Sequence, residues 1–195
     1  MTIGTEARRP PPPFTLHTLD ASSPRTSLEP VLRLSNRIFN TTASEPTHHS
    51  SLDEWCARLR QKDSILVYGS TAPDESIDPA SADGMPKRGG QVQVQTQARE
   101  VVGFVFAVVK TEPALPFPTL HVWLAGVSER ARGSGVFAAL MSRVQHHARS
   151  KGVNGLSVAT FPATFGKMYA ILLKQGWEAR EWKEEGKKVL MIKAI

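Results

Sequence analysis

The residues with the clearest chemical potential are Arg-Ala-Arg-Gly-Ser-Gly at positions 130–135. A periodic apolar segment follows directly, and its spacing predicts a helix that runs to about Ser150. The start of a helix leaves backbone N–H groups without an internal acceptor and carries a partial positive charge. Glycine has no Cβ, so an anion can approach these N–H groups closely, and two arginines add positive charge. The pattern therefore predicts an anion-binding site at the start of this helix.

Three interpretations of the glycine pair are open on the motif alone. Gly133 and Gly135 can be ordinary turn residues before a helix. The segment 133–138 also fits the G-x-G-x-x-A pattern of dinucleotide-binding loops. That pattern requires a tight turn from the preceding strand and an acidic residue about 20 positions further on, and neither is present. The third interpretation is a cradle for the pyrophosphate of coenzyme A, because a helix start suits phosphate oxygens.

The segment 130–135 matches the [Q/R]-x-x-G-x-[G/A] signature of the GNAT (Gcn5-related N-acetyltransferase) superfamily, and about residues 100–182 resemble that family in the order of their elements. The segment Leu-Leu-Lys-Gln-Gly-Trp near the C-terminus is similar to the family's Y-x-x-x-G-F segment, with Trp177 in place of phenylalanine. The resemblance implies a GNAT-like α/β fold and acetyl-CoA as co-substrate. It also implies that the backbone near Leu124 and Ala125 pairs with the pantetheine arm. The residues implied to surround the pyrophosphate are Arg130, Ala131, Arg132, Gly133, Ser134, Gly135 and Val136.

His121 is the first candidate for the base that an acetyl transfer to an amine requires. It precedes the signature on a predicted strand, and period-2 alternation places it on the same face as Thr119 and Trp123. A histidine of ordinary pKa can accept a proton at neutral pH, directly or through water. This strand resembles that of arylalkylamine N-acetyltransferases, in which two histidines alternate on one face. His121 matches the second histidine, and Thr119 stands at the position of the first. The alternative is a hydrogen-bonded histidine in a half-buried strand.

Tyr169 is the candidate acid for the leaving thiolate. The family commonly carries a tyrosine four residues before the glycine that ends the last helix, and here that position is Leu172. Phe165 replaces an asparagine that the family usually has earlier in the segment. Tyr169 lies one turn before Leu172, although it also fits a simple apolar stripe. Cys56 lies on the apolar face of a predicted helix, which argues against a covalent intermediate and favours direct transfer in a ternary complex.

Charge and composition narrow the classes of partner. The chain of 195 residues has a formal net charge of +6, which favours anionic partners. The basic residues lack interleaved aromatics and a nucleic-acid motif, so we expect no nucleic acid partner. One cysteine excludes an internal disulfide, and no group of histidines has metal-ligand spacing. Without an apolar run of about 20 residues or a signal sequence, we expect a cytoplasmic protein that is not bound to a membrane, as a monomer or homodimer.

The elements predict an α/β fold with a central mixed β-sheet flanked by helices. Residues 1–12 are expected to be a disordered arm, 13–195 a single domain, and 71–97 a flexible insertion. Strands are predicted at 13–20, 64–70, 100–110, 119–127 and 155–161, with a closing hairpin of 177–182 and 187–195. Helices are predicted at 27–40, 50–61, 135–150 and 163–175. Ser51 followed by Glu54 is a capping-box pattern for the second of these.

The sequence thus favours an acetyl-CoA-dependent N-acetyltransferase that acts on a small amine. An apolar or aromatic acceptor is suggested by three aromatic residues near the expected thioester position, Trp123, Phe161 and Phe165, which also fit a simple apolar core. A protein or peptide N-acetyltransferase is the second interpretation, with the segment 71–97 as part of a groove or cover. A non-catalytic acyl-CoA-binding module is the third, because the usual tyrosine and asparagine are missing.

Overall fold

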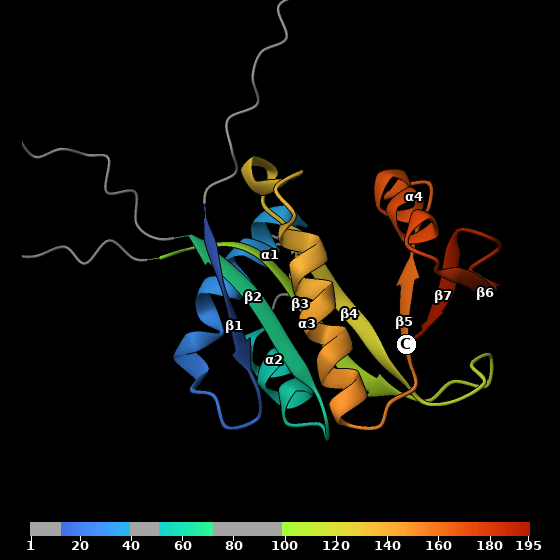
Figure 1. The fold of residues 1–195 in the computed structure, drawn as a ribbon, viewed down its shortest axis with the longest axis horizontal. Helices are drawn as coiled ribbons and strands as arrows, with labels where there is room; N and C mark the ends of the chain where they lie inside the picture. Colours follow the sequence, from blue (N-terminus) through green and yellow to red (C-terminus); the bar gives the residue numbers. More distant parts are fainter. Residues whose placement is uncertain (1–12, 40–50, 72–98) are drawn as a thin grey trace, which may run out of the picture.

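A computed structural model describes residues 13–39, 51–71 and 99–195. These residues form a seven-stranded sheet in the order β1-β2-β3-β4-β5-β7-β6, with α1 and α2 on one face and α3 on the other (Figure 1). All neighbouring strands are antiparallel except β4 and β5. The mixed α/β architecture expected from the sequence is confirmed. The expected arm at 1–12 and most of the expected insertion at 71–97 lie outside the described residues.

The elements follow the predicted order. The strands are β1 Phe14–Leu19, β2 Ile65–Thr71, β3 Glu100–Lys110, β4 Thr119–Val127, β5 Gly155–Thr160, β6 Glu178–Lys183 and β7 Lys188–Ala194. The α-helices are α1 Glu29–Ile38, α2 Leu52–Leu59, α3 Val136–Ser150 and α4 Gly166–Lys174. Short 3₁₀ turns, η1 Arg25–Ser27 and η3 Glu129–Ala131, precede α1 and α3. None of the helices in these described ranges is long and apolar enough to cross a membrane.

The helices are shorter than their periodic patterns. The pattern at 27–40 starts at Ser27, the last residue of η1, whereas α1 begins at Glu29. Similarly, α4 begins three residues later than expected, after a turn in which Phe165 N–H donates to Phe161 O at 2.7 Å. The predicted cap of α2 is confirmed, because the Ser51 hydroxyl oxygen accepts a hydrogen bond from Glu54 N–H at 3.3 Å. Apolar periodicity marks the buried face of a helix, but it does not mark the residue at which the backbone hydrogen bonds begin or end. The predicted helices therefore extend past the observed ends.

Two apolar layers cover the sheet, one on each face. β3 is buried along most of its length, as its continuous apolar sequence predicts. On the α3 face, Leu140 and Val144 pack against Val105 and Leu120. On the other face, the fully buried Trp55 of α2 packs against Phe104 and Phe106, with ring centroids 5.7 and 5.3 Å away. These layers fix α3 and β4, the two elements on either side of the signature loop.

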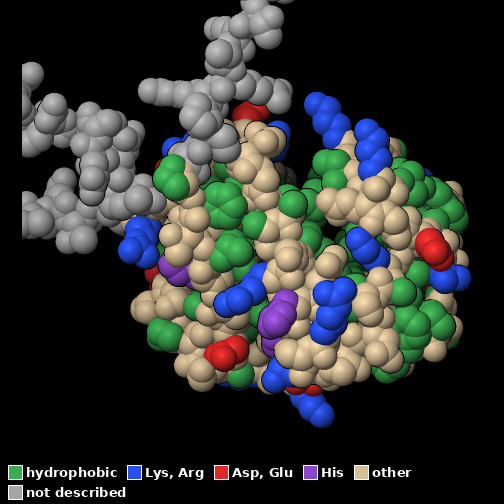
Figure 2. All heavy atoms as spheres, in the orientation of Figure 1, with side chains coloured by type: hydrophobic (Ala, Val, Ile, Leu, Met, Phe, Trp, Pro, Cys, Tyr) green, Lys and Arg blue, Asp and Glu red, His purple; other side chains and the backbone are tan. Residues whose placement is uncertain are grey.

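β4 and β5 separate soon after they begin to pair. Only Leu120, His121 and Val122 of β4 have partners in β5, at residues 156–158. A bulge lies just beyond, because Phe106 pairs with Leu124 while the next residue, Ala107, pairs with Val122. Figure 1 shows the two strands diverging from this point toward α3 and α4, and Figure 2 shows the surface hollowed between these helices. The divergence leaves one edge of β4 open beside the start of α3.

Gly103 sets the distance between α3 and the sheet. A Cβ added there would lie 2.9 Å from Val136 Cγ1 and 3.2 Å from the Gly126 carbonyl oxygen, whereas a Cβ at Gly69 would lie 3.7 Å from the same Val136 methyl. We expect Gly103→Ala to lower the free energy of unfolding by roughly 1–2 kcal/mol through overpacking. Gly69→Ala should be neutral or slightly stabilising. Urea unfolding of both variants measures the difference, and equal stability of the two would contradict this packing.

Candidate active site

The loop before α3 presents a group of free backbone N–H groups. Gly133 and Gly135 adopt φ of +80° and +85°, a left-handed conformation that favours glycine, and a Cβ added to either would meet nothing within 4 Å. Gly135 is the N-cap of α3, and no side chain caps the helix. The first hydrogen bond of α3 runs from Ala139 N–H to Gly135 O. Within the described part of the chain, five N–H groups therefore lack an acceptor: those of Gly133, Gly135, Val136, Phe137 and Ala138.

The other amides of the signature stabilise the loop itself. Ala131 N–H donates to Ser128 O at 3.0 Å, and Arg132 N–H donates to Glu129 O at 3.2 Å. Ser134 N–H and the Ser134 hydroxyl both donate to Ala131 O, the hydroxyl at 2.6 Å. The signature residues expected to surround the pyrophosphate thus divide into those that shape the loop and those whose N–H groups are free. The N–H groups of Phe137 and Ala138 extend the free set, which the signature itself does not indicate but general helix geometry does.

The two signature arginines differ in their surroundings. Arg130 forms an ion pair with Glu100 at the start of β3, and Arg37 of α1 lies 4.0 Å from the other carboxylate oxygen of Glu100. The Arg130 side chain is 56 % exposed, so solvent screens the pair and the guanidinium can exchange partners. Arg132 is exposed and has no ion-pair partner among the described residues. Positive charge therefore surrounds the free N–H groups.

Leu124 and Ala125 lie on the open part of β4. They pair with Phe106 and Val105 of β3, and neither has a partner in β5. Leu124 packs on the α1/α2 face, while Ala125 packs on the α3 face. Their unpaired edge faces the divergence between β4 and β5. An extended ligand with amide groups could add to this edge in the way a strand does.

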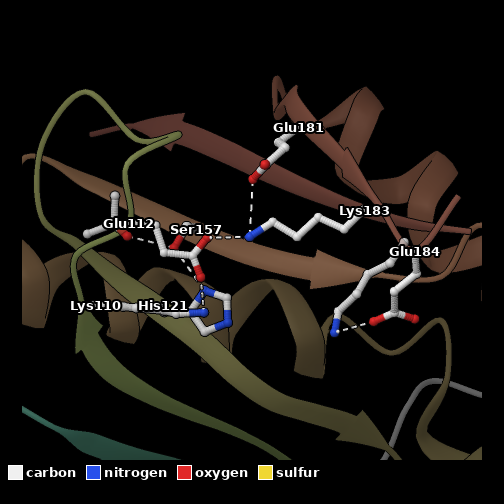
Figure 3. A network of polar contacts seen from close by, with 9 residues as sticks. Lys110, Glu112, His121, Ser157, Glu181, Lys183 and Glu184 are labelled. Atoms are coloured by element: carbon white, nitrogen blue, oxygen red, sulfur yellow. Dashed lines mark hydrogen bonds and ion pairs between the residues drawn. The ribbon is translucent and has the colours of Figure 1, made fainter. Parts of the chain in front are cut away.

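His121 lies where β4 and β5 are still paired. Its ring Nδ1 is 2.9 Å from the hydroxyl oxygen of Ser157, its partner across the parallel pair (Figure 3). Ser157 in turn contacts the Thr119 hydroxyl at 2.6 Å, and both of these side chains are fully buried. Burial, with a smaller contribution from nearby Lys110, lowers the pKa of His121 to about 4. The imidazole is therefore neutral at pH 7. Ser157 carries no catalytic signature, so sequence reasoning missed it.

A network of charges lies next to His121. Glu112, in the loop between β3 and β4, forms ion pairs with Lys110 and with Lys183 of β6, the latter at 2.9 Å (Figure 3). Lys183 also contacts Glu181 at 3.1 Å. The two lysines hold the pKa of Glu112 at about 2, well below its usual range. Glu112 is consequently an anion at all physiological pH values and attaches this loop to β6.

Tyr169 and His121 lie on opposite faces of the sheet. Tyr169 is half-buried, packs against the α3-face cluster, and contacts Trp182 of β6 with ring centroids 6.4 Å apart. Leu172, at the position where the family commonly has tyrosine, is buried in the same cluster. Phe165 is 43 % exposed and meets Phe39, just after α1, with ring centroids 6.5 Å apart. The structure gives no direct contact between the two candidate catalytic residues.

No group of three or more histidine, cysteine, aspartate or glutamate side chains in the described ranges is arranged to hold a metal ion. Cys56 is half-buried on α2 and packs beside Trp55 in the α1/α2 layer. The chemistry of the site therefore rests on the backbone cradle, the open edge of β4 and the few polar groups around His121.

Comparisons with known proteins agree with this geometry. The model of the Acetyltransferase (GNAT) family matches residues 70–168, just over half of the chain. A search of curated proteins finds no match. Among solved structures, NAA60 of Arabidopsis thaliana with a bisubstrate analogue is 14 % identical, with a TM-score of 0.60 over 93 % of this chain and 98 % of that one.

Two AAC(6') proteins have the same fold. The AAC(6')-Ih enzyme of Acinetobacter baumannii is 13 % identical, with a TM-score of 0.59 over 87 % of this chain and 93 % of that one. The AAC(6')-Iy structure, in complex with a bisubstrate analogue of coenzyme A and acetylneamine, is 16 % identical, with a TM-score of 0.58 over 86 % and 92 %. The family match, the sheet that opens between β4 and β5, and the glycine loop before α3 lead to one assignment: this chain belongs to the GNAT acetyltransferase family.

Proposed function

We propose that this protein transfers an acetyl group from acetyl-CoA to the amine of a small molecule, by direct attack in a ternary complex. Acetyl-CoA is the co-substrate of GNAT acetyltransferases. The observation that carries the proposal is the set of free N–H groups, those of Gly133 and of Gly135 to Ala138, next to the open edge of β4. A diphosphate fits this cradle, because the donors, the helix dipole and the exposed Arg132 all favour an anion.

The backbone of β4 and the backbone at the start of α3 would bind different parts of acetyl-CoA. The N–H groups of Gly133, Gly135 and Val136 would bind phosphate oxygens, and Phe137 and Ala138 would contribute two more donors. The backbone of Leu124 and Ala125 would pair with the amide groups of the pantetheine arm. With the arm bound in this way, the acetyl group would lie in the divergence between β4 and β5. The bound co-substrate supplies an activated acetyl carbon, and loss of the amine proton and departure of the thiol complete the transfer.

The candidate catalytic groups are His121 and Tyr169. The His121 ring would be neutral during the acetyl transfer, since burial disfavours its charged form. Tyr169 is proposed as the proton donor to the leaving thiolate, and otherwise a solvent proton serves, because Leu172 offers none. A small amine is favoured over a peptide by AAC(6')-Ih, which is named as an aminoglycoside antibiotic acetyltransferase, and by the acetylneamine part of the analogue bound to AAC(6')-Iy.

Two other functions are separated from this one by experiment. Peptide acetylation would use the same cradle with a different acceptor. A non-catalytic acyl-CoA-binding role is favoured by Leu172 and Phe165, which replace the usual tyrosine and asparagine. Calorimetry with acetyl-CoA, followed by thiol-release assays on a panel of small amines and a panel of peptides, distinguishes all three. Binding with turnover on small amines supports the proposal, and binding without turnover on either panel supports the non-catalytic role. Absence of binding removes every one of them.

Glu100 is expected to compete with the co-substrate for Arg130. Replacing Glu100 by glutamine removes the charge that holds the Arg130 side chain, with little change in shape. An exposed ion pair contributes up to about 1 kcal/mol, so we expect Glu100→Gln to tighten acetyl-CoA binding by up to roughly 5-fold. Calorimetry at low and high salt measures the effect, which salt should reduce. Unchanged or weaker binding at low salt would show that Arg130 does not reach the ligand.

A further inference from the structure

The side chains of Thr119, Ser157 and His121 form a continuous chain of buried hydrogen bonds. The distances are 2.6 Å from Thr119 Oγ1 to Ser157 Oγ and 2.9 Å from Ser157 Oγ to His121 Nδ1. Thr119 and Ser157 are fully buried, and His121 is 7 % exposed. Neither Thr119 nor Ser157 has another side-chain partner among the described residues. The Thr119 hydroxyl is one end of this hydrogen-bonded series, and the His121 ring, with Nε2 outside the two hydrogen bonds, is the other.

The positions of the protons in this chain are restricted. Two hydroxyl groups and a neutral imidazole bring three protons, and only two hydrogen bonds join them. If Thr119 donates to Ser157 and Ser157 donates to Nδ1, both hydroxyl protons are used and the ring proton resides on Nε2. If Nδ1 carries the proton instead, it donates to Ser157, and one of the two buried hydroxyl groups, that of Thr119 or that of Ser157, is left with a proton that has no acceptor among the described residues. A buried donor without an acceptor is costly, so the first arrangement is favoured.

We propose that Ser157 and Thr119 are positioning residues that hold His121 in the tautomer with the proton on Nε2, so that His121 acts as a hydrogen-bond donor to an acceptor atom of the reactants. This inference rests on the proposed acetyl transfer for its catalytic part, whereas the tautomer follows from the hydrogen bonds alone. It differs from the expectation that His121 is the base, because Nε2 in this tautomer has no lone pair to accept a proton.

The surrounding charges agree with a neutral donor. Burial is the main cause of the lowered pKa of His121; the charges of Lys110, Lys188 and Arg58 also favour the neutral ring, and that of Glu112 opposes them. A group with a pKa of about 4 is also a weak proton acceptor for an amine at neutral pH. A preorganised N–H donor, in contrast, is effective in a site from which water is excluded, because it needs no change of charge. The amine proton then leaves to solvent.

Three substitutions of His121 separate the two roles. His121→Gln places an amide N–H near the position of Nε2 but cannot act as a base, whereas His121→Asn ends near Nδ1 and His121→Ala has neither group. We expect the glutamine variant to keep kcat within roughly 10-fold of the unchanged enzyme and the other two to lose roughly 100-fold or more. Acetyl-CoA affinity and Tm of each variant control for folding. A glutamine variant that is folded, binds acetyl-CoA and is as inactive as the alanine variant would overturn the donor role, as would full activity of all three.

Nitrogen-15 NMR of histidine-labelled protein tests the tautomer without any assay of activity. We expect long-range couplings that identify a protonated Nε2 in the unchanged protein and in Thr119→Val, since Ser157 still donates there. Ser157→Ala removes the donor to Nδ1, and we expect the proton on Nδ1 to become detectable. A proton on Nδ1 in the unchanged protein overturns the proposal, and so does the same tautomer in all three proteins. If the protein has no turnover on any acceptor, the proposed function fails while this measurement still decides the tautomer.

Discussion

Gly135→Ala is expected to weaken acetyl-CoA binding at least roughly 10-fold, a loss of about 1.4 kcal/mol of binding free energy. Gly135 has φ of +85° and precedes the first residue of α3, where its N–H group has no acceptor in the described part of the chain. An added methyl group meets no protein atom within 4 Å, so it would occupy the space through which phosphate oxygens reach the helix start. The effect on the ligand therefore comes from that space and from the altered direction of the N–H groups.

Gly152→Ala is the matched control. Gly152 lies just after the other end of α3, has φ of +68°, and also has nothing within 4 Å of an added Cβ. Both substitutions force alanine into a left-handed conformation, which costs about 1–2 kcal/mol, so we expect similar losses of stability. Only the Gly135 variant should lose affinity for acetyl-CoA. Calorimetry and urea unfolding of the pair measure the two effects separately. Equal affinities of the two variants would mean that the pyrophosphate binds elsewhere, and the proposed cradle would be wrong.

The sequence predicts the frame of the site better than its reactive groups. The glycines and the helix after them are recognisable because an anion site on the backbone needs a fixed local spacing. The structure has both glycines at positive φ, before a helix whose first N–H groups are free. The divergence of β4 and β5 depends on a pairing that ends after three residues and on a bulge near Trp123, which no local pattern marks. The opening of the sheet therefore had to come from the tertiary structure.

The polar network around His121 could also not be predicted from the local sequence. Alternation places His121, Thr119 and Trp123 on one face, but Ser157 comes from a strand that is 36 positions away from His121. A serine in a short apolar strand has no signature, so its contact with the ring cannot be read from spacing. Tyr169 shows the converse: its position one turn before Leu172 predicts an acid for the leaving thiolate, and in the structure it packs against Trp182 and the α3-face cluster. Its role as an acid stays a prediction.

Glu112→Gln is expected to lower the free energy of unfolding by about 2 kcal/mol at pH 7. The Glu112 side chain is only 14 % exposed and balances Lys110 and Lys183, so its removal leaves two neighbouring cations without their shared anion. The folded pKa of about 2 is below the usual value of 4.5, which means that the folded state binds fewer protons than the unfolded state in this range. The contribution of Glu112 is therefore complete above pH 4.5 and is lost as the pH falls toward 2.

Glu181→Gln is the control for this prediction. Glu181 contacts the same Lys183 at 3.1 Å, but its side chain is 42 % exposed, so we expect a change within about 0.5 kcal/mol at pH 7. Chemical unfolding of both variants and the unchanged protein at pH 7, 4.5 and 3 gives the difference at each pH. The deficit of the Glu112 variant should shrink as the carboxylate of the unchanged protein becomes protonated. A deficit that is the same at pH 3 and pH 7 would show that Glu112 acts through packing, because a contribution from charge must follow the protonation of the carboxylate.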